Sequence, residues 1–98
     1  MKIQPWVDPI LQTNSGFKDE LVQQGHVRFV LDGTKYFIFP EGPHKYGLCY
    51  WSDMSTGGFP RWEFESEEEL MNAKLFNGHS IAQRLGEILT YDESTDYQ

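Results

Sequence analysis

The alternation of apolar and polar residues is clearest between residues 26 and 39. Residues 26–31 alternate, Asp32-Gly33 follows, and residues 34–39 form a second alternating run. Asp-Gly is a favoured pair for a two-residue type I′ turn, so this stretch predicts a β-hairpin. The turn also fixes the register. The predicted cross-strand pairs are Leu31 with Thr34, Phe29 with Tyr36 and Val27 with Ile38 on one face, and Arg28 with Phe37 and Val30 with Lys35 on the other.

Two further segments predict two more strands. Residues 45–51 follow a predicted turn at residues 40–43, and residues 61–65 follow the longest loop, residues 52–60. Consecutive antiparallel strands usually lie side by side. We therefore expect a four-stranded antiparallel meander.

Three segments predict helices. Ser15 is a suitable N-cap for a short helix over residues 16–24, and Gly25 ends it. The run Ser66–Glu69 has the form of a capping box and starts a second helix, which Asn77-Gly78 ends. A third segment has apolar residues at the i, i+4, i+7 and i+8 spacing of an amphipathic helix. These residues are Ile81, Leu85, Ile88 and Leu89.

The order of elements predicts an α+β fold in which one short N-terminal helix and two C-terminal helices pack mainly on one face of the meander sheet. A chain of 98 residues has the length of one domain, so residues 1–98 are interpreted as a single unit. Residues 1–14, with two prolines, are expected to form an irregular lead-in. Residues 91–98 are expected to form a frayed acidic tail.

The net charge of −7 is unevenly distributed. Residues 1–64 carry six basic and seven acidic side chains, whereas residues 65–98 carry two basic and eight acidic ones. Nucleic acids and anionic membranes attract clustered positive charge, so this distribution disfavours both as partners.

Cysteine content and hydropathy bear on the location of the protein. The single cysteine, Cys49, cannot form an intramolecular disulfide, and the N-terminus has no apolar run typical of a signal peptide. No stretch approaches the ~20 apolar residues of a membrane-spanning helix. We expect a cytoplasmic protein.

Few residues suggest catalysis or metal binding. Cys49 and His44 are a weak candidate for a thiol and its base, because no basic cluster near Cys49 in the sequence lowers its pKa. The three histidines and Cys49 lack the close pairing of metal-ligand motifs. The glycines of the 52–60 loop are followed by Phe59-Pro60 rather than by a helix that would bind phosphate. We predict no catalytic, cofactor-binding or metal-binding residues.

Aromatic residues are the most distinctive feature that remains. Phe37, Phe39 and Trp51 are predicted on the sheet face opposite the helices, and Phe59 and Trp62 are expected at its rim. Aromatic patches are common at protein interfaces, so one hypothesis is a non-catalytic interaction module. It would bind a protein partner or a second copy of itself through this face, with its acidic helical end contacting a basic surface.

Two alternatives stay open. Residues 1–14 can instead cover the aromatic face and close a second small core. The chain can also be a small-molecule-binding protein or an enzyme that uses the 52–60 loop together with His44 and Asp53.

Overall fold

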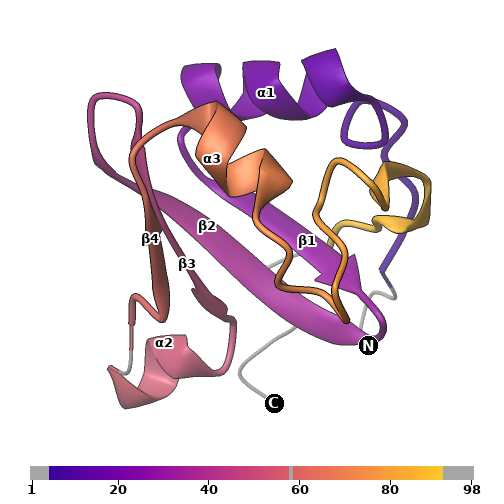
Figure 1. Cartoon of the computed structure of the whole chain (residues 1–98). Coiled ribbons are helices and arrows are strands. Elements are labelled where there is room, and N and C mark those ends of the chain that lie inside the picture. The colour runs from indigo at the N-terminus through magenta and orange to yellow at the C-terminus, as the bar shows by residue number, and fades with distance from the viewer. Residues whose placement is uncertain (1–4, 58, 92–98) are drawn as a thin grey trace.

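A four-stranded antiparallel sheet forms the centre of the fold (Figure 1). The structure is a computed structural model, which describes residues 5–57 and 59–91. The strands are β1 (Val27–Leu31), β2 (Thr34–Gly42), β3 (Lys45–Tyr50) and β4 (Trp62–Phe64), and they lie in the order β1-β2-β3-β4. The predicted meander is therefore confirmed.

The β1–β2 hairpin has the predicted turn and register. Asp32 and Gly33 both have positive φ angles, 54° and 76°, as a type I′ turn requires. All five predicted cross-strand pairs are present. The turn dipeptide therefore determines which side chains of this hairpin share a face.

The next turn lies further along the chain than predicted. β2 continues to Gly42 with an irregular register after Pro40, and Gly42 pairs with Lys45. The two turn residues are thus Pro43 and His44, and His44 has a φ of 58°. The predicted turn at residues 40–43 is wrong in position, because a bulge lets the strand pass Pro40 and still pair.

The N-terminal helix α1 spans Asn14–Gln23. Its N-cap is Thr13, whose hydroxyl oxygen accepts a hydrogen bond from the Gly16 amide at 3.1 Å, so the prediction of Ser15 as the cap is wrong. The helix ends as predicted at Gly25, where φ is 75° and the amide donates to the Leu21 carbonyl.

Helix α3 (Glu67–Asn72) begins at the predicted capping box, where the Glu69 amide donates to the Ser66 hydroxyl at 3.1 Å. The helix ends at Asn72, before the stop predicted at Asn77-Gly78, and these two residues do not terminate a helix. Both residues have positive φ, and Phe76 and His79 on either side exchange backbone hydrogen bonds. Asn-Gly therefore forms a second tight turn, like Asp32-Gly33.

The predicted third helix is wrong. Residues 81–89 contain only a 3₁₀ turn, η1 (Leu85–Glu87). The backbone of this segment bonds to distant residues instead: the Ala82 amide donates to the Met71 carbonyl, and Leu89 pairs with Val30 of β1. A short helix that was not predicted, α2 (Asp53–Thr56), lies within the 52–60 loop.

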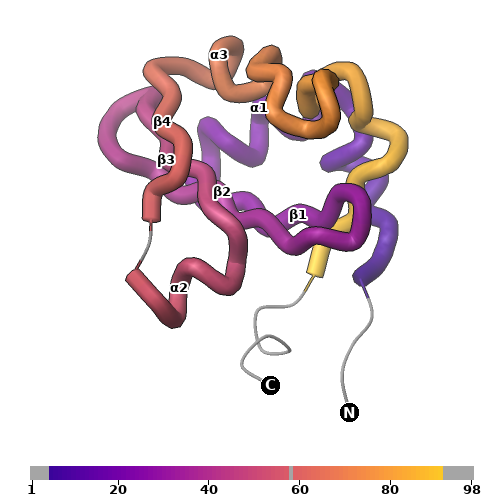
Figure 2. Tube along the Cα trace, turned by 60° about the horizontal axis from the view of Figure 1, so that its bottom comes forward, coloured from indigo at the N-terminus to yellow at the C-terminus, as the bar shows by residue number. Residues whose placement is uncertain are grey.

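The main core lies between the sheet and the helices α1 and α3, which cover one of its faces (Figure 2). Fully buried side chains from every layer meet there, including Phe17, Leu21, Phe29, Ile38, Leu48, Leu70 and Ile81. The prediction that helices cover mainly one face is confirmed. None of the helices in the described part of the chain is long and apolar enough to span a membrane.

Candidate interaction surface

The sheet face opposite α1 and α3 carries a second group of apolar side chains. Alternation along β2 and β3 directs Phe37, Phe39, Cys49 and Trp51 away from the main core, as the sequence predicts. The Phe37 ring lies 5.4 Å from the Trp51 ring and 5.9 Å from the Phe39 ring, between centroids. We call this side of the sheet, with Phe59 packed against Phe39, the aromatic face.

The chain segment around residue 90 covers one part of the aromatic face. Leu89 exchanges two backbone hydrogen bonds with Val30, at 2.7 and 3.1 Å, and so extends the sheet beyond β1. The Tyr91 ring packs 5.7 Å from Trp51, and its hydroxyl donates to the Tyr36 carbonyl at 2.9 Å. The expectation that Tyr91 belongs to a frayed tail is therefore wrong, and residues 92–98 lie outside the described residues.

The alternative in which residues 1–14 cover the aromatic face differs from what the structure shows for the described part of this segment. Trp6 pairs with Thr90 through two backbone hydrogen bonds, at the outer edge of the extended sheet, and its side chain is 43% exposed. Residues 1–4 lie outside the described part. Within the described residues, Leu89 and Tyr91 therefore close the second cluster, and the lead-in only supports them from outside.

The five predicted surface residues fall into three groups in the structure. Phe37 and Trp51 are buried, at 7% and 8% exposure. Trp62 lies on the other face of the sheet, where it packs against the main core and against Tyr50. Phe39 is half-buried and Phe59 is 40% exposed, and their rings meet edge to face at 5.7 Å. The accessible part of the aromatic face is therefore centred on Phe39 and Phe59.

Gly47 holds the Phe39 ring in place. The two residues are cross-strand partners, and a Cβ built on Gly47 would lie 2.6 Å from the Phe39 ring and 3.1 Å from Pro60. The ring therefore occupies the space of the missing side chain. Sequence reasoning missed this contact, although a glycine within a strand is a recognised sign of close approach.

Charged side chains flank the aromatic face on opposite sides. Glu63 pairs with Gly47 in the row of Phe39, and Glu41 and Glu65 lie near it. Partial desolvation raises the pKa of the Glu41 carboxyl, and the negative charges of Glu63 and Glu65 raise it further. At the other side, Arg28 pairs with Phe37, and His26 stacks on the Phe37 ring at 5.7 Å.

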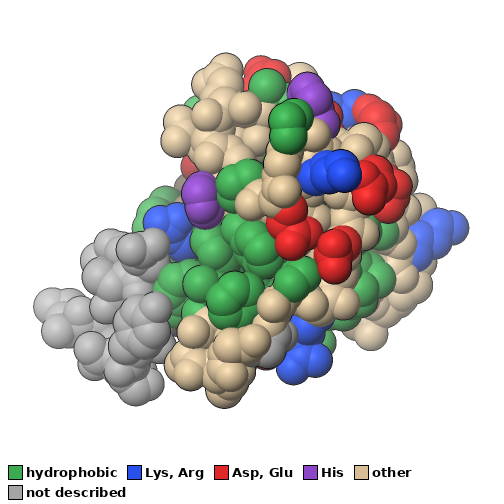
Figure 3. All heavy atoms as spheres, turned by 90° about the vertical axis from the view of Figure 1, so that its left-hand side faces the viewer, with side chains coloured by type: hydrophobic (Ala, Val, Ile, Leu, Met, Phe, Trp, Pro, Cys, Tyr) green, Lys and Arg blue, Asp and Glu red, His purple; other side chains and the backbone are tan. Residues whose placement is uncertain are grey.

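Figure 3 shows the same layout on the molecular surface. Hydrophobic side chains gather in one patch, acidic side chains border it on one side, and a histidine and a basic side chain border it on the other. An open hollow of about 500 Å³ lies at the basic side, lined by Glu20, Gln24, His26, Arg28 and Phe37.

The 52–60 loop does not bring together the residues of the alternative hypothesis. His44 precedes β3 and Asp53 follows it, so the length of the strand, ~20 Å, separates them. His44 instead bonds to Glu67 at 2.8 Å, and this carboxylate also accepts from the buried Tyr46 hydroxyl at 2.5 Å. The contact ties β3 to α3.

Asp53 is engaged within the loop itself. The residue is 4% exposed, and its carboxylate accepts from the Tyr50 amide at 3.1 Å and from Arg61 Nε at 2.6 Å. The hydrogen bond from Arg61 lowers the pKa of Asp53. Arg61 also lies over the Tyr50 ring, 4.7 Å from its centroid. Asp53 therefore holds the loop against the sheet. A hollow of about 500 Å³ beside Ser52 is lined by residues 33–36 and 50–52.

Cys49 has the environment of a structural residue. Its side chain is fully buried in the second cluster, and burial raises the pKa of its thiol to about 11. A thiol in this environment stays protonated and is a poor nucleophile. Among the described residues, no group of three or more histidine, cysteine, aspartate or glutamate side chains lies close enough to hold a metal ion together.

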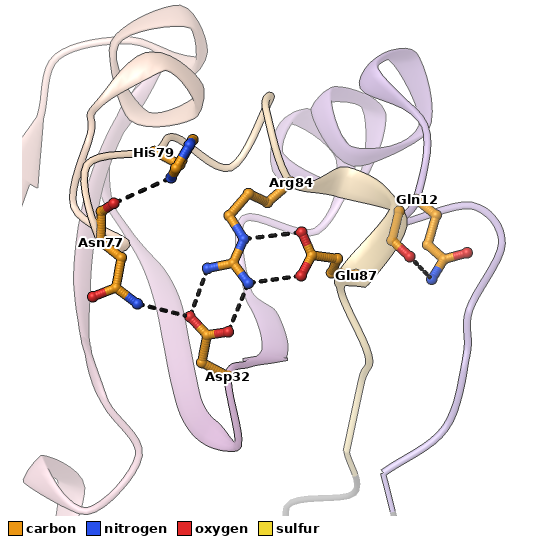
Figure 4. A network of polar contacts seen from close by, with 7 residues as sticks. Gln12, Asp32, Asn77, His79, Arg84 and Glu87 are labelled. Atoms are coloured by element: carbon orange, nitrogen blue, oxygen red, sulfur yellow. Dashed lines mark hydrogen bonds and ion pairs between the residues drawn. The ribbon is translucent and has the colours of Figure 1, made fainter.

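Arg84 is the centre of a polar network that sequence reasoning missed (Figure 4). Its guanidinium donates to both carboxylate oxygens of Asp32, at 2.5 and 2.6 Å, and to both of Glu87, at 2.8 and 3.0 Å. The pKa of Asp32 is lowered mainly by the hydrogen bond from Arg84. Asn77 also donates to Asp32, at 3.4 Å. The network fastens the segment after α3 to the β1–β2 turn.

Comparison with models of known protein families, with curated proteins and with solved structures gave no match for this chain.

Proposed function

We propose that this chain is a non-catalytic protein-interaction module that binds another protein molecule through the accessible part of the aromatic face. The observation that carries the proposal is the pair of Phe39 and Phe59, whose rings meet on a sheet face that α1 and α3 leave uncovered. Burial of one such ring at an interface contributes about 1.5–3 kcal/mol.

The contact between Phe39 and Gly47 supports the proposal, because it fixes the ring before any partner arrives. A rigid anchor loses little conformational entropy on binding. The charged residues on either side also have the arrangement of an interface, in which a polar rim surrounds an apolar centre.

The acidic helical end, formed by Glu67, Glu68 and Glu69 in the first turn of α3, is a weaker candidate for a contact with a partner. Two of its three carboxylates are engaged within the molecule, since Glu67 bonds to Tyr46 and His44 and Glu68 forms an ion pair with Lys18. The first turn of α3 therefore serves to attach the helix to its neighbours. The aromatic face is the surface that we propose for recognition.

Substitution of Phe59 by serine tests the proposal. The full chain and its Phe59→Ser variant are immobilised, and the proteins that each retains from a lysate of the cells that express it are identified by mass spectrometry. Sedimentation velocity measures self-association of the same two proteins. We expect Phe59→Ser to weaken binding roughly tenfold to hundredfold, from the lost burial of one ring.

The matched control is Val22→Ser, because Val22 is 58% exposed and lies on α1, on the covered side of the sheet. Binding by this variant should equal that of the unaltered chain. If Phe59→Ser changes neither self-association nor any retained protein, the aromatic face is not an interface.

A further inference from the structure

We infer that the partner of the aromatic face is a basic protein segment in which lysine or arginine side chains flank an apolar residue. The inference rests on the function proposed above and adds the chemistry of the partner. The apolar residue of the partner packs on the rings of Phe39 and Phe59, and a cationic side chain binds the carboxylates beside these rings.

Glu63 is the carboxylate that the sheet places beside the apolar centre. Its neighbours Trp62 and Phe64 pack in the main core, so alternation along β4 turns Glu63 toward the aromatic face. Glu63 pairs across the strands with Gly47, over which the Phe39 ring lies. Gly47 has no side chain, and neighbouring strands lie roughly 4.8 Å apart. One side chain of a partner can therefore contact the ring and the carboxylate together.

The acidic side of the aromatic face carries unpaired negative charge. In the part of the chain that the structure describes, neither Glu41 nor Glu63 forms a salt bridge, whereas Glu65 pairs with Lys45 at 3.5 Å. Three carboxylates and one ammonium group leave a net charge of −2 there. Besides partial desolvation, the charges of Glu63 and Glu65 raise the pKa of Glu41, so the three carboxylates lie close enough to repel one another. A cation bound among them would relieve this repulsion.

The basic side chains near the aromatic face are engaged within the molecule. Lys35 lies over the Tyr91 ring, 5.5 Å from its centroid, and Arg28 also has a partner within the chain. Arg61, which lies just before β4, donates to both carboxylate oxygens of Asp53, at 2.6 and 3.1 Å. Negative charge is therefore what the described part of this face offers to a partner, and charge complementarity selects a cationic one.

The exposed rings determine what else the partner carries. The Phe59 side chain is 40% exposed, and its ring meets that of Phe39 edge to face. Apolar groups of a partner remove these rings from water, and the face of an aromatic ring also attracts a cation within about 6 Å. Lysine and arginine suit such a site because they combine an apolar stem with a charged end. A basic segment with an apolar residue between its charges therefore complements both the rings and the carboxylates.

Other partners fit this surface less well. A second copy of the chain has a net charge of −7, and its Arg28 and Lys35 already have partners. An uncharged apolar partner would remove Glu41 and Glu63 from water without pairing them, which is costly for ionised groups. Nucleic acids and anionic membranes carry the same sign of charge as the acidic side and are repelled.

Selection of short random peptides displayed on phage, with the full chain as the bait, tests the inference. The selected peptides should be rich in lysine and arginine around one large apolar residue, and their affinity should fall as the salt concentration rises. The variant Glu63→Lys reverses the charge beside Phe39. Peptides selected on the unaltered chain should bind this variant at least about tenfold more weakly.

Asp19→Lys is the matched control, because it makes the same change in net charge at an exposed position of α1, on the other side of the sheet. This variant should bind the selected peptides like the unaltered chain. Glu41→Gln removes one unpaired carboxylate without reversing its charge, and it should weaken binding about two- to fivefold. Circular dichroism verifies that each variant is folded.

The carboxyl of Glu41 reports where the peptide binds. Its pKa, followed by nuclear magnetic resonance, should fall when a selected basic peptide is bound, because a cation beside a carboxylate favours the ionised form. A pKa of Glu41 that does not change on binding would place the cationic side chains away from this cluster and overturn the inference.

Three further results would overturn the inference: selected peptides that are neutral or acidic, basic peptides that bind Glu63→Lys as well as the unaltered chain, or no selected peptide at all. Phe59→Ser separates this failure from failure of the proposed function. If neutral or acidic peptides lose affinity for Phe59→Ser, the aromatic face still binds a partner, but one of different chemistry. If no peptide is selected and Phe59→Ser changes neither the proteins retained from the lysate nor self-association, both proposals fail.

Discussion

The Phe39 ring lies over the α-carbon of Gly47, its partner on the neighbouring strand, in the space that a side chain would fill. The packing of Phe39 on Gly47 therefore affects both the stability of the sheet and the shape of the surface that we propose for recognition. Anything larger than hydrogen at position 47 has to displace the ring.

Replacement of Gly47 by alanine should therefore destabilise the protein. The added Cβ would lie 2.6 Å from the Phe39 ring, and such overpacking costs about 1–3 kcal/mol. Urea denaturation measures the free energy of unfolding. The control is Gly86→Ala, because no atom lies within 4 Å of a Cβ at that position. Similar stability losses for the two variants would contradict the close approach of Phe39.

Replacement of Asp53 by alanine should also destabilise the protein, by about 1–3 kcal/mol at neutral pH, because the partly buried Tyr50 amide and the Arg61 guanidinium lose their acceptor. The pKa of Asp53 is lower in the folded state than in the unfolded chain. Its contribution is thus present above the unfolded pKa and lost as the pH falls through the folded pKa.

The measurement for Asp53 is a series of urea denaturations from pH 7 to below roughly pH 4. The difference between the unaltered chain and Asp53→Ala should shrink toward the acid end of the series. A difference that stays constant with pH would show that the carboxylate is not the stabilising group.

Tyr91 should contribute to stability although it stands close to the end of the chain. Tyr91→Ala removes a side chain that is 3% exposed and packs on Trp51, so we expect a loss of about 3–5 kcal/mol. Tyr91→Phe keeps the ring and removes the hydroxyl that donates to the Tyr36 carbonyl, and loss of this hydrogen bond should cost about 1 kcal/mol. Near-ultraviolet circular dichroism should show a changed Trp51 signal for Tyr91→Ala alone. Equal stability of Tyr91→Ala and the unaltered chain would mean that Tyr91 does not close the second cluster.

Arg84 and Asp32 should act as one unit. Arg84→Met and Asp32→Asn each break the paired hydrogen bonds between them, and asparagine tolerates the positive φ of position 32. We expect either change to speed hydrogen exchange at the amides of residues 87 and 88, which close the 3₁₀ turn. The double variant should add little to Arg84→Met. Fully additive effects would indicate that the two residues stabilise the segment independently.

The sequence by itself determined the features that depend on neighbouring residues. Asp32-Gly33 selects a turn whose geometry fixes the register of β1 and β2, and the capping box at Ser66 sets where α3 starts. Alternation along β2 and β3 then places Phe37 and Cys49 on one face. Each of these outcomes follows from local backbone preferences.

The tertiary structure alone decided the course of residues 76–91. The apolar spacing of Ile81, Ile88 and Leu89 fits a helix, yet Ile88 packs in the main core and Leu89 in the second cluster. The segment passes the edge of β1, where hydrogen bonds to Val30 replace those of a helix, so adjacent side chains enter opposite sides of the sheet. Local periodicity does not encode these long-range bonds, and they decide how much of the aromatic face stays accessible.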